Sequence, residues 1–142
     1  MKKIIFLLLI PILFVACKSH NEIPFYEAKN YFVRNDIQNS VPVKFESEKD
    51  FKEYFGMAAV MGKDGMPTSI DFTKQYVIAV TLPETDTETD INLVSLKKDT
   101  NSDIILTYKV ITGEKRSYAI IPVRLLIVDK KYDGTVKLIR QE

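Results

Sequence analysis

The chain has 142 residues, of which 46% are hydrophobic and 27% charged, with 20 basic and 19 acidic side chains. This length suits one domain with its own core and is too short for two domains of ordinary size. The balanced charge gives no electrostatic case for binding nucleic acid, whose backbone requires a basic surface, and a chain with one cysteine cannot form an internal disulfide.

Residues 1–16 have the pattern of a secretory signal peptide. Lys2 and Lys3 precede the apolar run from Ile4 to Ala16, and a short positive region before about a dozen apolar residues is typical of such signals. The run is shorter than the ~20 residues of a membrane-spanning helix. The pattern therefore predicts export of the rest of the chain.

The residues FVAC, which end at Cys17, resemble a lipobox, in which small residues precede a cysteine that is acylated before the signal is cleaved. We therefore expect Cys17 to carry palmitate and to anchor the protein in a membrane. The alternative is an ordinary secreted protein with an unpaired thiol, which would pair between molecules or stay reactive. Lys18, rather than Asp, follows the cysteine, which favours the outer membrane. No acidic cluster follows immediately, which favours a protein that faces the periplasm over one exported to the cell surface.

Residues 17–25 are expected to form a short lipidated tether, and residues 26–142 a single β-rich globular domain. A first strand is expected at Tyr31–Val33. A second, half-buried strand is predicted at residues 41–45, where Val41, Val43 and Phe45 alternate with other residues.

The pattern changes to a helical period in SEKDFKEYFG, residues 47–56. Ser47 and Asp50 approximate a capping box at its start, and Gly56 or Gly62 can end the helix. One helical face carries the aromatic side chains Phe51, Tyr54 and Phe55. This is the one helix that we predict.

Residues 56–69 hold three of the five glycines and three of the four methionines. They predict a loop, or a frayed extension of the helix followed by a loop, with a turn at Asp64–Gly65. Residues 76–82 are almost all apolar, which favours a central strand covered on both faces.

In the second half of the chain, strands are expected to alternate with polar turns. The acidic residues 84–90 are predicted to connect two strands, and the next strand alternates from Ile91 with a slip before Leu96. A reversal is expected at Thr112–Gly113, and Pro122 should mark an edge, a bulge or a break into two strands.

The sequence KYDG, residues 131–134, predicts a hairpin before a final strand in which Val136 and Leu138 face one way. The whole pattern contains six to eight strands and one early helix. It indicates an α+β domain with a mainly antiparallel sheet, arranged as a small sandwich or barrel.

Asp86, Glu88 and Asp90 are spaced two apart and could converge on calcium. An EF-hand loop counted from Asp86 needs Gly at the sixth position and Glu at the twelfth, and those positions hold Ile91 and Lys97. A solvated acidic loop that protects a sheet edge is the favoured interpretation, and calcium binding is left open.

Catalysis by a nucleophile is not expected. Cys17 is assigned to the lipid and His20 to the tether, so the domain lacks the imidazole of a Ser–His–Asp or Cys–His site, and zinc is not expected either. The chain contains no phosphate-cradling glycine loop and no dinucleotide motif, so we predict no cofactor. A hydrolase that uses two carboxylates is an alternative, with the candidates Glu53, Asp71, Glu114 and Asp129.

Protein binding is the favoured class of function. Methionines in the glycine-rich loop can adapt to an apolar partner, although Met57 and Val60 could instead continue the core face of the helix. In GEKRSY, arginine and tyrosine are types that interfaces favour, and a solvated hairpin rim is the alternative there. The candidate partner-binding residues are Met61, Met66, Pro67, Arg116 and Tyr118.

A family resemblance rests on the helix with Asp50, Phe51 and Phe55, on Ile70–Asp71–Phe72, and on the strand Val77–Val80. These elements are similar to those of small Gram-negative envelope lipoproteins with a domain of the protease-complex-stabilising (PrcB C-terminal) type. The similarity runs from about residue 43 to residue 138. It implies a non-enzymatic accessory domain that binds or steadies a secreted partner, and it carries over no catalytic residue.

We therefore expect a membrane-anchored envelope lipoprotein that acts as a non-catalytic protein-binding module. Its partner would be another envelope protein, and the module would stabilise or inhibit a secreted hydrolase. The alternatives are a carboxylate-dependent hydrolase and a purely structural envelope lipoprotein.

Overall fold

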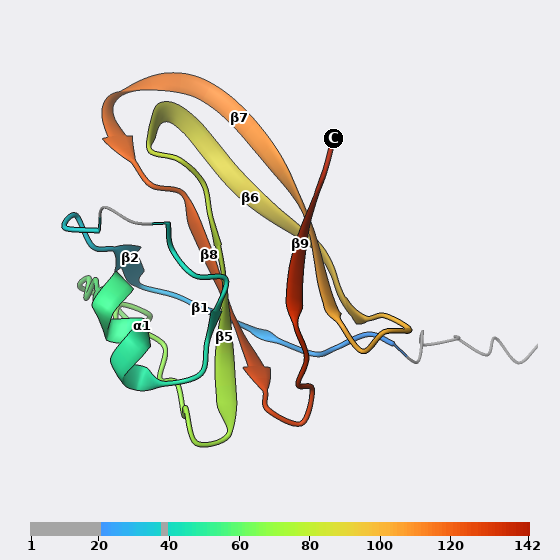
Figure 1. Cartoon of the computed structure of the whole chain (residues 1–142). Coiled ribbons are helices and arrows are strands. Elements are labelled where there is room, and N and C mark those ends of the chain that lie inside the picture. The colour runs from blue at the N-terminus through green and yellow to red at the C-terminus, as the bar shows by residue number, and fades with distance from the viewer. Residues whose placement is uncertain (1–20, 38–39) are drawn as a thin grey trace, which may run out of the picture.

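The computed structural model describes residues 21–37 and 40–142, so the predicted signal peptide, Cys17 and the start of the predicted tether lie outside the described residues. Within these residues the chain forms nine strands and one short helix (Figure 1). In chain order the elements are β1 Tyr26–Ala28, β2 Tyr31–Val33, β3 Lys44–Phe45, α1 Glu48–Tyr54, β4 Phe55–Met57, β5 Gln75–Thr81, β6 Thr85–Lys98, β7 Ile104–Ile120, β8 Val123–Asp129 and β9 Val136–Gln141.

All strand pairs but one are antiparallel; the exception is the parallel pair β7–β9. The predicted α+β class with a mainly antiparallel sheet and one early helix is confirmed, with nine strands rather than six to eight. The three sheets are open, and a small sandwich or barrel stays a prediction.

The centre of the molecule is the four-stranded sheet β1-β8-β5-β3. Residues 76–80 of β5 are all buried, which confirms the predicted central strand. Side chains of a strand alternate between its faces: Tyr76, Ile78 and Val80 join one hydrophobic cluster, and Val77 and Ala79 join the other. The near-continuous apolar sequence of β5 follows from this double burial.

The sheet β6-β7-β9 covers the first face of the central sheet. Ile91 and Leu96 of β6 and Ile104 and Leu106 of β7 are buried there. Beyond the part of β7 that pairs with β9, β6 and β7 continue as a curved two-stranded arm (Figure 1). The arm consists of residues 85–90 and 110–120.

Helix α1 and the two-stranded sheet β2-β4 cover the other face. The Ser47 hydroxyl accepts a hydrogen bond from the Asp50 N–H at 3.2 Å and donates one to the Asp50 carboxylate at 2.7 Å, which confirms the predicted helix start. The helix ends at Tyr54 with Phe55 as its C-cap, next to the predicted Gly56 and well before the alternative Gly62. Gly56 lies under the Phe32 ring, because a Cβ on Gly56 would stand 2.5 Å from Cζ of Phe32.

The predicted connection over residues 84–90 is wrong, because Thr85 begins β6. Threonine alternates here with acidic residues, and β-branched threonine suits a strand. The reversal predicted at Thr112–Gly113 is also wrong, because β7 runs through both residues. A Cβ on Gly113 would lie 2.8 Å from Oε2 of Glu88 on β6, so this glycine permits close packing of neighbouring strands and makes no turn.

The predicted hairpin at residues 131–134 is wrong as well. Strand β8 pairs with β1 and β5, whereas β9 pairs with β7, so this turn joins two different sheets. The predicted strand at residues 41–45 is shortened to β3. Two finer predictions are confirmed: Pro122 separates β7 from β8, and the register of β6 shifts between Leu93 and Ser95.

The described part of the predicted tether, residues 21–25, belongs to the domain. Ile23 is 4% exposed, and two backbone hydrogen bonds of 2.9 Å join Ile23 N to Leu96 O and Lys98 N to Asn21 O. The assignment of these residues to a tether is wrong, because Ile23 is part of the core beside β6 and Phe25 packs against the same cluster. In the part of the chain that the structure describes, no helix is suited in length and apolarity to span a bilayer.

Candidate protein-binding groove

A groove of about 520 Å³ lies between α1, β4 and residues 66–72. Its floor is aromatic: Phe51 stacks on Phe55 with ring centroids 4.8 Å apart. The Phe51 ring also lies 5.2 Å from that of Tyr31 and 5.6 Å from that of Phe72. Phe51 and Phe55 are each only 3% exposed, so they close the bottom of the groove as part of the core. The half-buried Tyr31 and Phe72, held in place by these rings, supply the aromatic surface that a ligand could reach.

Exposed apolar side chains stand at the rim of the groove. Met57 is 64% exposed and Met66 is 76% exposed, and Pro67 lines the groove beside Met66. Methionine adapts its shape to a partner more easily than branched side chains do. An apolar floor with an adaptable rim fits the apolar side chains of another protein.

The charged groups around the groove are neutralised within the chain. The Arg34 guanidinium binds the Asp36 carboxylate at 2.8 Å, and Lys52 Nζ binds Glu48 at 2.6 Å. The hydrogen bond from Arg34 also lowers the pKa of Asp36. Since both cations already have an acidic partner, the groove favours an apolar ligand over an ionic one.

Asn30 holds the loop that carries Met66. Its side-chain amide donates hydrogen bonds to the Asp64 and Met66 carbonyls at 2.8 and 3.0 Å. Next to it, the Tyr31 hydroxyl donates to the Thr68 carbonyl at 2.6 Å, and burial raises the pKa of this hydroxyl above its usual value. These bonds fix the rim of the groove to β2.

The sequence-predicted binding residues do not form one site. Met66 and Pro67 lie together in the groove. Met61 is fully exposed in the preceding loop and is not among the residues that line the groove. The alternative that Met57 and Val60 continue the core face of the helix is wrong, since they are 64% and 61% exposed and follow the helix end.

Arg116 and Tyr118 lie on the arm, and they contact each other. The Arg116 guanidinium donates to the Tyr118 hydroxyl at 3.2 Å and lies 5.7 Å from the ring centroid. Arg116 also binds Glu88 of β6 at 2.9 Å. They form a second surface, on elements that contribute nothing to the groove lining.

The acidic residues of β6 each pair with a different cation. Asp86 binds Lys115 at 3.0 Å, Glu88 binds Arg116, and Asp90 binds Arg124 of β8 at 2.5 Å. Among the described residues, no three Asp, Glu, His or Cys side chains gather as a metal site would require.

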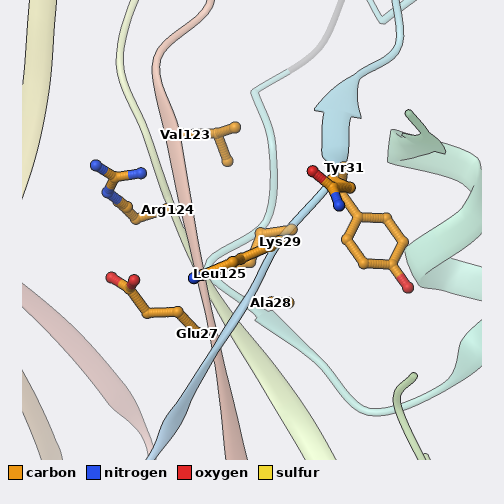
Figure 2. A pocket seen from close by; sticks show the side chains of 8 residues that line it. Glu27, Ala28, Lys29, Tyr31, Val123, Arg124 and Leu125 are labelled. Atoms are coloured by element: carbon orange, nitrogen blue, oxygen red, sulfur yellow. The ribbon is translucent and has the colours of Figure 1, made fainter. Parts of the chain in front are cut away.

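A smaller pocket of about 270 Å³ lies where β1 meets β8 (Figure 2). In this view the side chains of Glu27 and Arg124 point to one side of the strands and Tyr31 to the other. The Arg124 guanidinium binds Asp90 and donates to the Ile91 carbonyl at 3.2 Å. Its cation is therefore occupied in holding β6 to the central sheet.

The four candidate carboxylates of the hydrolase alternative lie at exposed positions on separate elements: Glu53 on α1, Asp71 before β5, Glu114 on β7 and Asp129 at the end of β8. Two of them shape turns. The Asp71 carboxylate accepts from the Thr73 N–H at 3.0 Å, and the Asp129 carboxylate accepts from the Lys131 N–H at 2.8 Å.

Sequence reasoning missed Phe72 as a lining residue of the groove and Asn30 as the residue that holds its rim. Phe72 belongs to the Ile70–Asp71–Phe72 element that carried the resemblance, which is the signal that could have identified it. Asn30 gives no local signal of its role, because its bonding partners lie 34 and 36 residues further along the chain.

Comparison with family models, with curated proteins and with solved structures finds no match to this chain.

Proposed function

We propose that this chain is a lipid-anchored outer-membrane protein that faces the periplasm, and that its domain binds an envelope protein without catalysing a reaction. The resemblance in the sequence suggests a secreted hydrolase as partner, which the domain would stabilise or inhibit. The groove beside α1 is the proposed contact site.

One observation carries this proposal: the exposed Met57 and Met66, with the half-buried Pro67, border a preformed groove with an aromatic floor. Exposed apolar side chains that gather at one groove commonly mark a protein-binding site. Lipid on Cys17 would keep the groove close to the membrane surface, where envelope enzymes are also held.

The groove is tested by comparing Met66→Asp with the matched variant Met61→Asp. Each replaces one exposed methionine of the same loop by a carboxylate, but only Met66 lines the groove. After crosslinking in living cells, we expect the envelope protein captured by the unaltered chain to be lost with Met66→Asp and retained with Met61→Asp. Equal capture by both variants would exclude the groove as the contact site.

The anchor is tested by metabolic labelling with palmitate. We expect the unaltered chain to incorporate the label and Cys17→Ser to incorporate none, because the thiol is the acylation site. Cys17 is the only cysteine, so labelling that persists in Cys17→Ser would refute the assignment.

A further inference from the structure

Strand β7 has a long edge on the arm that no described strand covers. β9 pairs with β7 from Ile104 to Lys109, while β7 continues to Ile120 with β6 on its other side. The β6–β7 register shifts between Thr85 and Thr87 and between Thr87 and Thr89, so beyond Ile111 only Thr112, Lys115 and Ile120 of β7 have a β6 partner in register. Figure 1 shows β7 on the outer side of the curved arm. Backbone N–H and C=O groups along such an edge can pair with a further strand.

The same part of β7 exposes large apolar side chains. Ile111 is 55% exposed, Tyr118 is 56% exposed and Ile120 is 37% exposed. They lie within one segment of the arm, and they are of types that stabilise cross-strand pairs. A strand added to this edge would cover part of their surface.

Charged side chains usually keep sheet edges apart, but each of the two neighbouring cations of this edge has an acidic partner on β6. Lys115 binds Asp86 at 3.0 Å and Arg116 binds Glu88 at 2.9 Å, both across to β6. Repulsion between two copies of the segment is therefore reduced. Glu114 stands beside these cations at an exposed position.

We propose that two copies of this chain associate through antiparallel pairing of β7 with β7 around a two-fold axis at Lys115. In such a pair, residues equally distant from the axis stand opposite each other. Glu114 of each copy then faces Arg116 of the other, and Thr112 faces Tyr118. The segment is thus complementary to itself in charge, and pairing joins the two β6-β7-β9 sheets into one.

Disulfide trapping in cells that express the full chain tests this dimer. Lys115→Cys places a thiol at the axis, where opposed Cα atoms of an antiparallel pair lie about 4.5–5.5 Å apart, within disulfide reach. After oxidation with copper phenanthroline, we expect a covalent product of twice the chain mass. Lys63→Cys, in an exposed loop, and the unaltered chain measure the background, including any product of Cys17.

Charge reversal then tests the register. Glu114→Lys added to Lys115→Cys places a cation opposite Arg116 of the other copy, so we expect the dimer product to fall to the background level. Glu53→Lys makes the same charge change on α1 and should leave the product unchanged. Resistance to limited proteolysis checks that each variant is folded.

The proposal is overturned if Lys115→Cys and Lys63→Cys give equal product, or if Glu114→Lys has no effect. A product whose mass is not twice that of the chain would also overturn it, in favour of a different protein at this edge. Palmitate labelling and capture through Met66 do not depend on these results, because the arm contributes no residue to the groove lining.

Discussion

Asn30 combines a backbone conformation and two side-chain contacts that position the rim of the groove. Its φ of 63° lies in the left-handed region, which asparagine tolerates better than most residues do. Its amide holds the Asp64 and Met66 carbonyls. The chain therefore turns after β1 and anchors the methionine loop with one side chain.

Replacing Asn30 separates these two contributions. Asn30→Gly removes both hydrogen bonds but accepts the left-handed backbone, whereas Asn30→Ala removes the bonds and adds backbone strain. We expect the free energy of unfolding of Asn30→Ala to be about 1 kcal/mol below that of Asn30→Gly, after allowing for the flexibility of unfolded glycine. Urea denaturation measures the difference, and equal stabilities would show that the left-handed conformation is not required.

At the level of single residues, the features that could be predicted are those that depend on residues close by in the sequence. Ser47 caps α1 through Asp50, three residues away, and Pro122 ends β7 because it has no N–H to donate. Asn30 could not be predicted, because its role depends on a loop that only the folded chain brings near. The same limit applies to Met66, whose sequence indicates exposure but not the aromatic floor beside it.

The acidic first half of β6 shows why one element was missed. Its composition is typical of a connection, because six charged or polar residues in a row, residues 85–90, do not indicate a buried face. It forms a strand because cations on β7 and β8 stand opposite its carboxylates. Cross-strand pairing of this kind stabilises a sheet, but the sequence does not state which segments will be neighbours.

The turn between β8 and β9, which joins two sheets, is held by Lys44 of β3. Lys44 Nζ binds Asp133 at 2.7 Å and Glu46 at 3.0 Å, and the Asp133 carboxylate also accepts from the Gly134 N–H at 2.8 Å. Burial alone would lower the pKa of Lys44, but its carboxylate partners outweigh burial and raise it. The hydrogen bond from Lys44 lowers the pKa of Asp133.

These shifts give the pair a defined pH dependence. Because the pKa of Asp133 is lowered in the folded protein, its contribution is complete above the unfolded value of 3.8 and is lost as pH falls through the folded value. Lys44→Met should therefore be less stable than the unaltered protein at pH 6, and the difference should shrink at pH 3. Urea denaturation at both values measures it.

Asp133→Asn is the matched background for this prediction. It removes the carboxylate that titrates, so Lys44→Met added to Asp133→Asn should cost nearly the same stability at both pH values. A difference that shrinks equally in both backgrounds would assign the pH dependence to groups other than Asp133.

On the scale of the whole molecule, the central sheet joins two clusters into one folding unit. Leu126 and Val128 of β8 face the β6-β7-β9 sheet, while Leu125 and Ile127 face α1. The near-continuous apolar sequence of residues 76–82 indicated this central position for β5, but no such prediction was made for β8. The sequence did not indicate that β9 pairs parallel with β7, because that pairing depends on a turn that leads from one sheet to another.

Leu106→Ala tests this coupling between layers. Leu106 is fully buried between β7 and the central sheet, whereas Ile139 on β9 is 48% exposed. We expect Leu106→Ala to lower the free energy of unfolding by about 2–5 kcal/mol, because it leaves a cavity, and Ile139→Ala to lower it by less than about 1 kcal/mol. Leu106 packs in the same cluster as residues of β5. We therefore expect Leu106→Ala to accelerate the hydrogen exchange of the slowest β5 amides as much as that of the slowest β7 amides. Loss of protection confined to β6, β7 and β9 would instead show that this sheet unfolds as a separate unit.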